Sequence, residues 1–382
     1  MGQSIYMQWA AAVWLITAAG ILYIVAGYPL LLHILARFRA HPIAKRIFRP
    51  SITVVLPVYN GERYIEAKLR TILALDYPKH MLEILVVSDG STDRTDKITL
   101  GFAAHGVRLI RVPRGGKPAA LNAAIGEASG ELLFLTDVRQ PLAQDCLTIL
   151  ANCFADPTVG AVSGELIIRD GKTHAEGDVG LYWKYEKWIR QKLSAIDSIF
   201  GATGACYMMR RELAKPLPED CLLDDMHLPL NAFFDGYRLV MEPLAKAYDE
   251  PTPLDAEFRR KVRTLGGNYQ ILGAFPALLG PKNRMWIHFV SYKFGRLVLP
   301  WLLLILLASS FFLPQPWSWW SLMAQSVIYL LALIDPILPS RFPLKRISSP
   351  ARSFLVMMLA VLCGLSVLFH DPRRLWKVRQ HS

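Results

Sequence analysis

Two long stretches of this chain carry no charged side chain, and they restrict the folds that it can adopt. No Asp, Glu, Lys or Arg precedes Arg37, and residues 9–36 are predominantly apolar. Residues 297–334 form the second charge-free stretch. A helix needs about 20 apolar residues to cross the hydrocarbon core of a bilayer. The sequence therefore predicts membrane-spanning helices near both ends of the chain.

The N-terminal stretch has the features of an uncleaved membrane anchor. A secretory signal peptide begins with basic residues and ends at a small-residue cleavage site, and neither is evident here. The positive-inside rule predicts a plasma- or inner-membrane protein whose central part is cytoplasmic, because only basic charges follow the anchor. The alternative to a membrane anchor is that residues 9–36 form a buried helix in the core of a soluble protein. The basic residues that follow are Arg37, Arg39, Lys45, Arg46 and Arg49.

The C-terminal stretch is divided by the sequence "PQP" into two possible spans, residues 297–313 and 317–334, and a third apolar run covers 353–369. One anchor and three spans would place the tail, residues 371–382, outside the cytoplasm, although it carries four basic residues. Either one short run lies in the membrane interface without crossing, or the charge rule fails at the tail. The tryptophans that we expect at the interfaces are Trp301, Trp317, Trp319 and Trp320.

Composition narrows the classes of function. The chain has 382 residues, of which 53% are hydrophobic and 19% charged, and its net charge is +12. A basic excess attracts nucleic acid, anionic lipid or phosphorylated substrates. Because the basic residues cluster beside the apolar stretches and no recognition motif occurs, the sequence disfavours nucleic acid. No CxxC pair occurs, and we expect reduced core thiols at Cys146, Cys153, Cys206, Cys221 and Cys363.

Residues 51–250 alternate between strand-like and helix-like patterns. The strand-like runs are "SITVVLPVY", "EILVVSD", "VRLIRV" and "ELLFLTD", and amphipathic helical segments separate them. This alternation predicts βαβ units and a parallel sheet covered on both faces. In such sheets ligands bind at the carboxyl ends of the strands.

Two acids and a basic glycine loop fall at those strand ends. Asp89 and Asp137 each end a strand-like run, and we expect both carboxylates to project into one crevice. Gly115 and Gly116 allow a ligand to approach the backbone closely, and Lys117 then opens a helix whose free N–H groups favour an anion. Taken singly, each acid is more typical of a turn or a cap. Neither P-loop spacing nor GxGxxG occurs, which disfavours nucleotidases and dinucleotide oxidoreductases.

As an ordered set, "PVYN", "SDGSTD", "GGKPAALN" and "TD" resemble family 2 glycosyltransferases over residues 50–270, closest to the membrane-associated branch of cellulose and hyaluronan synthases. The resemblance implies an α/β fold of the GT-A, Rossmann-like nucleotide-diphospho-sugar transferase class with flanking transmembrane helices. The expected division is an anchor with a basic linker (1–49), a GT-A domain (50–255), an interfacial amphipathic segment (256–296), transmembrane helices (297–370) and a basic tail (371–382).

The resemblance also implies roles on the donor side. Asp89 corresponds to the aspartate that accepts a hydrogen bond from the uracil of a UDP-sugar, and Lys117 lies near the diphosphate. Asp137 corresponds to the first acid of the Asp-x-Asp metal motif, whose second acid is replaced here by Arg139. One carboxylate with substrate phosphates and water can still hold Mg²⁺ or Mn²⁺, and Arg139 can alternatively act as a fixed cation against phosphate. The lip over the nucleotide base is formed by Pro57, Val58, Tyr59 and Asn60.

On the acceptor side the resemblance places Thr203 and Gly204 near the incoming hydroxyl and makes Asp225 the general base, with Asp224 beside it. A carboxylate within hydrogen-bond reach can take the proton of a sugar hydroxyl as the C–O bond forms. Adjacent acids repel each other, which raises the pKa of one of them. A glycine turn and a helix-capping pair are the structural alternatives for these two motifs.

Two further segments have mixed interpretations. Arg260 and Arg263 correspond to the arginines that clamp the diphosphate, or else provide membrane-surface charge. Thr264 replaces the tryptophan of processive relatives, which weakens the prediction of a processive polymerase. In the amphipathic helix at 180–195 the aromatic side chains can stack on a sugar, lie on the membrane or pack in a core, and we favour the core. They are Tyr182, Trp183, Tyr185 and Trp188.

The sequence thus predicts an inverting, membrane-bound glycosyltransferase of cell-surface glycan synthesis. Its partners would be a nucleotide-sugar donor, a lipid-linked or polysaccharide acceptor, membrane lipid and a divalent cation. One alternative is a non-processive glycosyltransferase of a lipid headgroup. The other is a non-catalytic scaffold or transport subunit with a degenerate domain, which Arg139 favours and which Lys117 and Asp225 disfavour.

Overall fold

The computed structural model describes residues 2–168, 174–250, 254–339 and 342–372. The chain divides into two compact units. One, the sheet unit, comprises Phe38–Arg169 and Arg190–Pro251, and the other, the helical unit, comprises Met1–Arg37, Asp170–Ile189 and Thr252–Ser382. Most of the tail expected at 371–382 lies outside the described residues.

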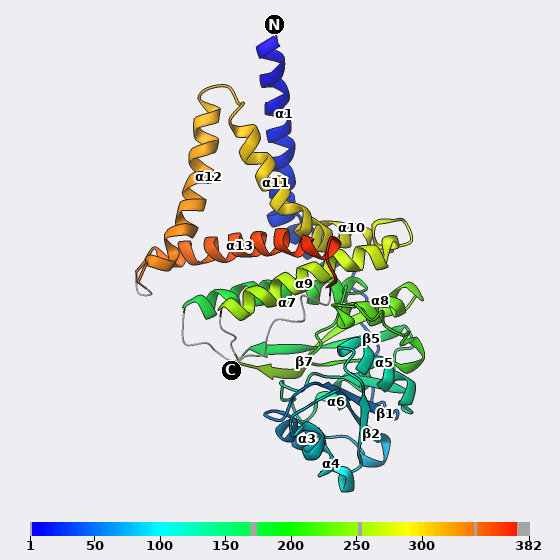
Figure 1. Ribbon diagram of the computed structural model, residues 1–382. Coiled ribbons are helices and arrows are strands. Elements are labelled where there is room, and N and C mark those ends of the chain that lie inside the picture. Colours follow the sequence, from blue (N-terminus) through cyan, green and yellow to red (C-terminus); the bar gives the residue numbers. More distant parts are fainter. Residues whose placement is uncertain (1, 169–173, 251–253, 340–341, 373–382) are drawn as a thin grey trace. The chain divides into compact units, whose positions relative to one another are not determined.

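The sheet unit is built on seven strands in the order β3-β2-β1-β4-β6-β5-β7 (Figure 1). The predicted alternation is confirmed for β1 to β4, which pair in parallel. The parallel pairing does not extend to the whole sheet, because β6 runs antiparallel to both β4 and β5. Strand–helix alternation does not fix the direction of a strand that follows a helix as long as α7. The strands are β1 (Ile52–Val58), β2 (Leu82–Asp89), β3 (Val107–Val112), β4 (Leu132–Leu135), β5 (Val159–Ile168), β6 (Tyr207–Arg210) and β7 (Arg238–Asp249).

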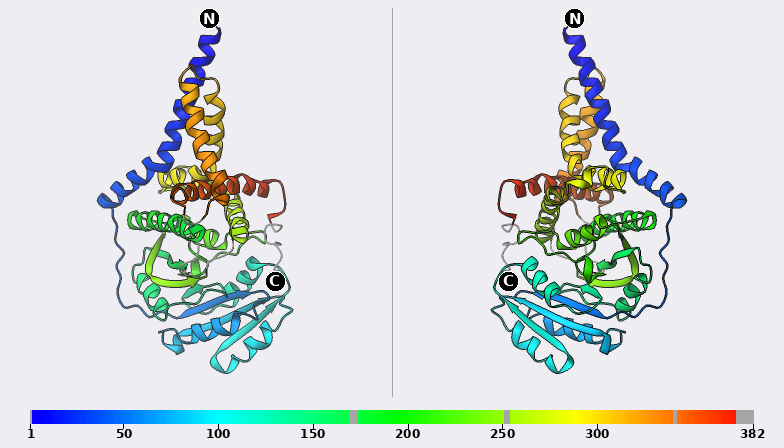
Figure 2. Two further views of the ribbon diagram at one scale, coloured as in Figure 1. Left: turned by 90° about the vertical axis from the view of Figure 1, so that its left-hand side faces the viewer. Right: turned by 90° about the vertical axis from the view of Figure 1, so that its right-hand side faces the viewer.

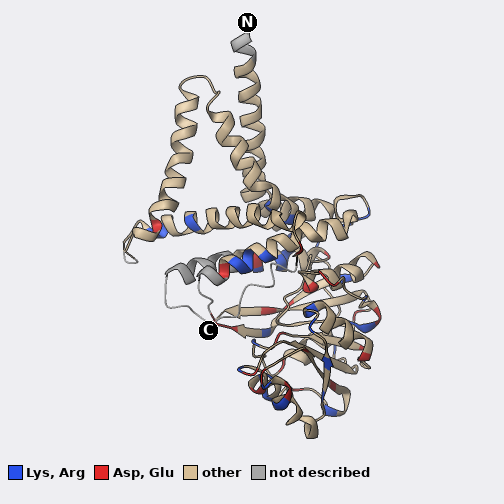
Figure 3. Ribbon diagram, viewed as in Figure 1, with Lys and Arg blue, Asp and Glu red and all other residues tan. Residues whose placement is uncertain are grey.

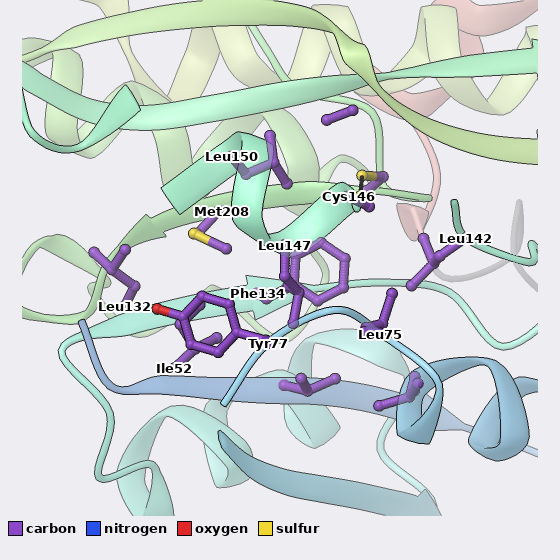
Figure 4. Close-up of a cluster of buried hydrophobic side chains, with 14 of the residues drawn as sticks. Ile52, Leu75, Tyr77, Leu132, Phe134, Leu142, Cys146, Leu147, Leu150 and Met208 are labelled. Atoms are coloured by element: carbon purple, nitrogen blue, oxygen red, sulfur yellow. Dashed lines mark hydrogen bonds between the residues drawn. The ribbon is translucent and has the colours of Figure 1, made fainter. Parts of the chain in front are cut away.

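The helices of the sheet unit bury apolar stripes against the strands. In α3, Ile65, Leu69 and Ile72 recur at helical spacing and are fully buried. They join alternate residues of β1 and the inner face of α6 in one hydrophobic cluster (Figure 4). The opposite face of β1, β2 and β3 contacts α5, so the sheet is covered on both faces as predicted. These helices are α3 (Ile65–Leu73), α4 (Thr95–Leu100), α5 (Lys117–Glu127), α6 (Cys146–Cys153) and α8 (Asp224–Phe234).

Within the described ranges, four helices of the helical unit are long and apolar enough to cross a membrane: Tyr6–Phe38, Trp286–Ser310, Trp317–Ile337 and Lys345–Leu368. Figure 3 shows α1, α11 and α12 almost free of charge, whereas α9 is densely charged. The tryptophans at the start of α12 are largely exposed, as expected for an interfacial position. The elements are α1 (Gly2–Leu22), α2 (Tyr28–Phe38), α7 (His174–Ile196, shared with the sheet unit), α9 (Leu254–Ala274), α10 (Trp286–Phe289), α11 (Gly295–Ser310), α12 (Trp317–Ile334) and α13 (Lys345–Gly364).

Within this unit, α13 lies across the ends of α11 and α12 and not alongside them (Figures 1 and 2). It packs closely on α9, since a Cβ atom at Gly364 would lie 2.8 Å from the backbone nitrogen of Gly266. Its N-terminal end is held to the end of α12 by the buried Asp335, which lies 3.0 Å from the Lys345 ammonium and 3.4 Å from the Arg352 guanidinium.

Two predictions of burial are wrong in part. Four cysteines are buried, but Cys363 is exposed on α13. On α7, Tyr185 is 39% exposed, whereas Glu186 and Ile189 are buried. Tyr185 therefore falls outside the buried stripe of this helix and is not a core residue. Trp188 is half-buried and stacks on His33, while the side chains of residues 182 and 183 lie outside those described.

Candidate active site

The loop between β3 and α5 is fixed by Asp89 at the end of β2. The Asp89 side chain is buried, and its Oδ1 accepts the N–H groups of Gly115 (2.7 Å) and Gly116 (3.0 Å). Its Oδ2 is paired with Arg114. Gly116 has a φ of 89°, a conformation that favours glycine. Asp89 thus sets the position from which Lys117 starts α5.

The Lys117 ammonium lies among the other acidic side chains of the predicted site. Its Nζ lies 2.9 Å from Oδ1 of Asp137, which follows β4, and 3.0 Å from Oδ2 of Asp224, the first residue of α8. Burial lowers the pKa of Lys117, but the charges of Asp137, Asp224 and Asp225 outweigh it and raise that pKa above its ordinary range. The lysine is therefore a permanent cation among three carboxylates.

Gly204 lies against the same cluster. A Cβ atom built on it would be 3.2 Å from Asp137 Oδ2 and 3.5 Å from both Asp225 Oδ2 and Lys117 Nζ. The N–H of Gly204 donates to Asp225 Oδ2 (3.1 Å), and the N–H of Thr203 donates to a side chain of β5, Ser163 Oγ (3.0 Å). Asp137, Asp225 and Lys117 thus converge on one point, and Asp89 is joined to that point through the loop.

Asp225 has an environment suited to a base. As an acid in the first turn of α8, its charge is favoured by the N-terminal end of the helix dipole. Burial and the neighbouring charge of Asp224 raise the pKa of Asp225 to about 6, although Lys117 opposes them. This pKa keeps the carboxylate largely ionised at neutral pH and makes it a better proton acceptor than an ordinary aspartate.

The segments expected to contact the nucleotide, which follow β1 and β2, lie next to each other. The N–H of Asn60 donates to Ser91 Oγ (3.1 Å), and Asn60 Oδ1 accepts the N–H of Thr92 (2.8 Å). Pro57 precedes them on β1. The Arg114 guanidinium lies over the Tyr59 ring, 3.7 Å from the ring centroid, in a cation–π contact. Sequence reasoning missed Arg114, although its position directly before the Gly-Gly-Lys motif was a signal.

Sequence reasoning also missed Tyr207. Its neighbours Cys206 and Met208 belong to the hydrophobic cluster, so the alternation of a strand turns Tyr207 to the opposite face of the sheet. Burial and the charges of Asp224 and Asp225 raise the pKa of this phenol. The side chain is 1% exposed, and within the described part of the chain its hydroxyl has no hydrogen-bond partner.

The residues around Asp137 bear on a metal site. The Arg139 guanidinium lies 2.6 Å from Asp249, a buried acid at the end of β7. Among the described residues no three or more His, Cys, Asp or Glu side chains are arranged so that they could together hold a metal ion. The Asp137 side chain, however, is 38% exposed. A single accessible carboxylate fits a divalent cation that takes its other ligands from substrate phosphates and water.

Arg260 and Arg263 lie on α9 in the helical unit, whereas the other predicted site residues belong to the sheet unit. Arg260 lies 3.0 Å from Glu257 on the same helix. Thr264 donates its hydroxyl to the Arg260 carbonyl oxygen (2.9 Å). The roles predicted for both arginines therefore stay predictions.

A mixed sheet of this order, with acids and a lysine at its strand ends, defines a GT-A-type fold. The chain superposes on the mannosyltransferase PcManGT from Pyrobaculum calidifontis, in complex with GDP-Man and Mn²⁺, with a TM-score of 0.73 and 24% identity, over 96% of this chain and 100% of that one. The fold class predicted from the sequence is confirmed.

The family follows from the sequence matches. Residues 53–217 match the model of glycosyl transferase family 2, and residues 140–334 match that of glycosyl transferase family group 2. The chain therefore belongs to glycosyltransferase family 2, as the motifs predicted.

Curated relatives agree with this assignment. An N-acetylglucosaminyltransferase of Rhizobium meliloti (strain 1021) is 29% identical over 68% of this chain and 65% of its own length. A poly-beta-1,6-N-acetyl-D-glucosamine synthase of Staphylococcus aureus (strain COL) is 26% identical over 58% of this chain and 55% of its own length. The chain spans about three fifths of the length of such relatives.

Replacing Gly204 by alanine tests the convergence of the charged groups. The new methyl group would press on Asp137 Oδ2 at 3.2 Å and touch Asp225 Oδ2 at 3.5 Å, while the backbone at 204 is not left-handed and accepts alanine. We expect turnover of the donor to fall by up to about 10²-fold, which is the order of effect that a misplacement of about 1 Å has on reacting groups. Gly126→Ala on α5, where a Cβ meets nothing within 4 Å, is the control and should retain activity. Equal activity of both variants would contradict the site geometry.

Proposed function

We propose that this protein is an inverting glycosyltransferase that moves a sugar from a nucleotide-sugar donor to an acceptor hydroxyl. The observation that carries the proposal is the convergence of Asp137, Asp225 and Lys117 beside Gly204. One basic and two acidic groups at a single point supply what glycosyl transfer needs, which is a proton acceptor for the nucleophile and positive charge for the leaving group.

The donor in this proposal lies along the carboxyl ends of β1, β2 and β4. Its base lies against Tyr59, near Asp89 and Arg114, and its diphosphate lies at Lys117 and the N-terminal end of α5. Two relatives bear names that refer to N-acetylglucosamine, which supports a UDP-sugar as donor. The solved mannosyltransferase with the same fold carries GDP-Man, so guanosine donors belong in the first panel of substrates.

In the reaction, Asp225 accepts the proton of the acceptor hydroxyl as its oxygen bonds to the anomeric carbon. The bond from that carbon to the diphosphate breaks on the opposite face, so the configuration inverts and a nucleoside diphosphate leaves. Lys117 stabilises the negative charge that develops on the diphosphate. A divalent cation, Mg²⁺ or Mn²⁺, held by Asp137 and the phosphates would add further positive charge to the leaving group.

For the acceptor, we propose a lipid-linked glycan or a growing surface polysaccharide at the membrane. Relatives named as polysaccharide synthases support this assignment. A single transfer to a lipid headgroup is the second candidate, and Thr264 favours it, because this threonine stands where processive relatives of the resembled branch carry tryptophan.

For topology, we propose that α1, α11 and α12 cross the membrane and that α13 lies in the interface. Asp335, Lys345 and Arg352 keep the start of α13 at the end of α12, and contact with the charged α9 keeps its other end out of the hydrocarbon. Three crossings leave the end of α13 on the same side as the basic residues that follow α2, which the positive-inside rule makes cytoplasmic. The sheet unit is then cytoplasmic.

Replacing Asp225 by asparagine tests the role of the base. The amide keeps the shape of the side chain but cannot accept the proton, so we expect release of nucleoside diphosphate to fall by on the order of 10²–10⁴-fold with donor binding retained. Purified protein is assayed with a panel of UDP- and GDP-sugars, Mn²⁺ and membrane extract as acceptor. Asp235→Asn, at the exposed end of α8, is the matched control. Turnover that survives in Asp225→Asn would contradict the mechanism, and no turnover by the unaltered protein with any donor would favour a scaffold.

The pH dependence of turnover reports the same group. Since Asp225 must be ionised and its pKa is about 6, kcat/KM should fall as the pH drops through about 6 and stay level just above it. The measurement is a rate profile between about pH 5 and about pH 8. A profile with no inflection near pH 6 would show that another group accepts the proton.

Single-cysteine labelling tests the topology. Cysteines introduced at His370, at His105 in the sheet unit and at Gln315 between α11 and α12 are probed in a variant that lacks the exposed Cys363. An impermeant maleimide should label 370 and 105 in the same vesicle orientation and 315 in the opposite one. Labelling of 370 together with 315 would mean that α13 crosses the membrane.

A further inference from the structure

A buried lysine lies behind the site that the proposed mechanism uses. Lys68 is on the inward face of α3, at helical spacing from Ile65 and Ile72, and is 2% exposed. No carboxylate among the described residues forms an ion pair with it. An ammonium group in such a place costs stability, because burial removes its hydration and neutral partners replace only part of it. Apolar side chains fill the rest of this face, so packing alone does not explain a lysine here.

The Lys68 ammonium holds both ends of one short segment. We call residues 136–140, which contain Asp137, the acid loop. Nζ of Lys68 donates to the Thr136 hydroxyl at 2.7 Å and to the Gln140 carbonyl oxygen at 2.6 Å. One cation therefore clasps the first and the last residue of the loop, and the Asp137 carboxylate is presented between the two contacts.

The clasp extends to the acceptor side of the site. The Thr136 hydroxyl, which accepts from Lys68, donates its own proton to the Ala205 carbonyl oxygen at 2.7 Å. Ala205 follows Gly204, whose N–H contacts Asp225. A continuous line of hydrogen bonds thus runs from α3 through the acid loop to the turn beside the proposed base.

The electrostatics agree with this geometry. Burial lowers the pKa of Lys68 to about 8, and the nearby Cys206 and Asp137 partly oppose that effect. The lysine is thus still charged at neutral pH. The far side of the acid loop is held independently, since Arg139 and Gln140 both donate to the buried Asp249 (2.6 and 3.0 Å).

We propose that Lys68 is a positioning residue for donor binding, whose ammonium holds the acid loop so that Asp137 faces the diphosphate. The inference rests on the proposed function, and it gives a reason to retain a destabilising buried charge. Lys68 touches neither substrate nor reacting atoms. Its effect therefore falls on the affinity for the nucleotide with its metal ion and not on folding.

The test is Lys68→Met, which keeps an unbranched apolar side chain one atom shorter than lysine and removes the charge. Dissociation constants for UDP and for GDP, each with Mn²⁺, are measured by calorimetry on the full-length protein, together with the thermal midpoint. We expect at least tenfold weaker binding of the preferred nucleotide and a midpoint that is unchanged or higher, because a buried charge has been removed. Arg70→Met, an exposed residue of the same helix, should change neither quantity.

Thr136→Val supplies a second variant, since it removes both hydrogen bonds of the relay at constant shape. It should also weaken nucleotide binding with folding preserved. If a folded Lys68→Met or Thr136→Val protein binds the nucleotide with unchanged affinity, the inference about Lys68 is overturned and the proposed function is not affected. Loss of folding in both variants overturns the inference as well, because the lysine would then serve stability. If the unaltered protein binds neither nucleotide, the proposed function fails and the inference falls with it.

Discussion

The structure of the candidate site depends on one ammonium group among three carboxylates. Asp137, Asp224 and Asp225 come from two segments that are distant in sequence, and without compensation their charges would repel each other. Lys117 lies within 3.0 Å of two of them, and its charge moderates the pKa of the third. The start of α5, the end of β4 and the start of α8 are therefore held together by charge as well as by the sheet.

The positive charge that replaces the second acid of the family's metal motif is neutralised by a neighbouring acid. Where an acid is expected after Asp137, this chain has Arg139, and the buried Asp249 lies 2.6 Å from its guanidinium. The basic substitution is thus neutralised by a partner on β7 and leaves the charge balance around Lys117 intact. The acid loop keeps one exposed carboxylate. In the proposed mechanism, the diphosphate therefore depends more on Lys117 and on the loop position that Lys68 maintains.

Much of this arrangement was predictable from local sequence. The GT-A fold was indicated by the strand-like runs, the helix that begins at Lys117 and the order of the motifs. The same motifs predicted that Asp137, Asp225 and Lys117 belong to one site. The features that could not be predicted depend on contacts between segments distant in sequence. Strand–helix alternation does not fix the antiparallel direction of β6, and the place of Tyr207 near Asp224 and Asp225 depends on segments distant in sequence. Tyr207 carries no local signal, because a tyrosine in a strand is an ordinary residue. Lys68 does carry one, since it lies at helical spacing from Ile65 and Ile72 on the apolar face of α3.

The most direct measurement of the central claim is an experimental structure of the protein with UDP and Mn²⁺. The account predicts the diphosphate in contact with the Lys117 ammonium, the metal ion on the Asp137 carboxylate, and Asp225 free of the phosphates on the opposite side of Gly204. A diphosphate bound away from Lys117, or an Asp225 carboxylate that ligates the metal ion, would contradict the account.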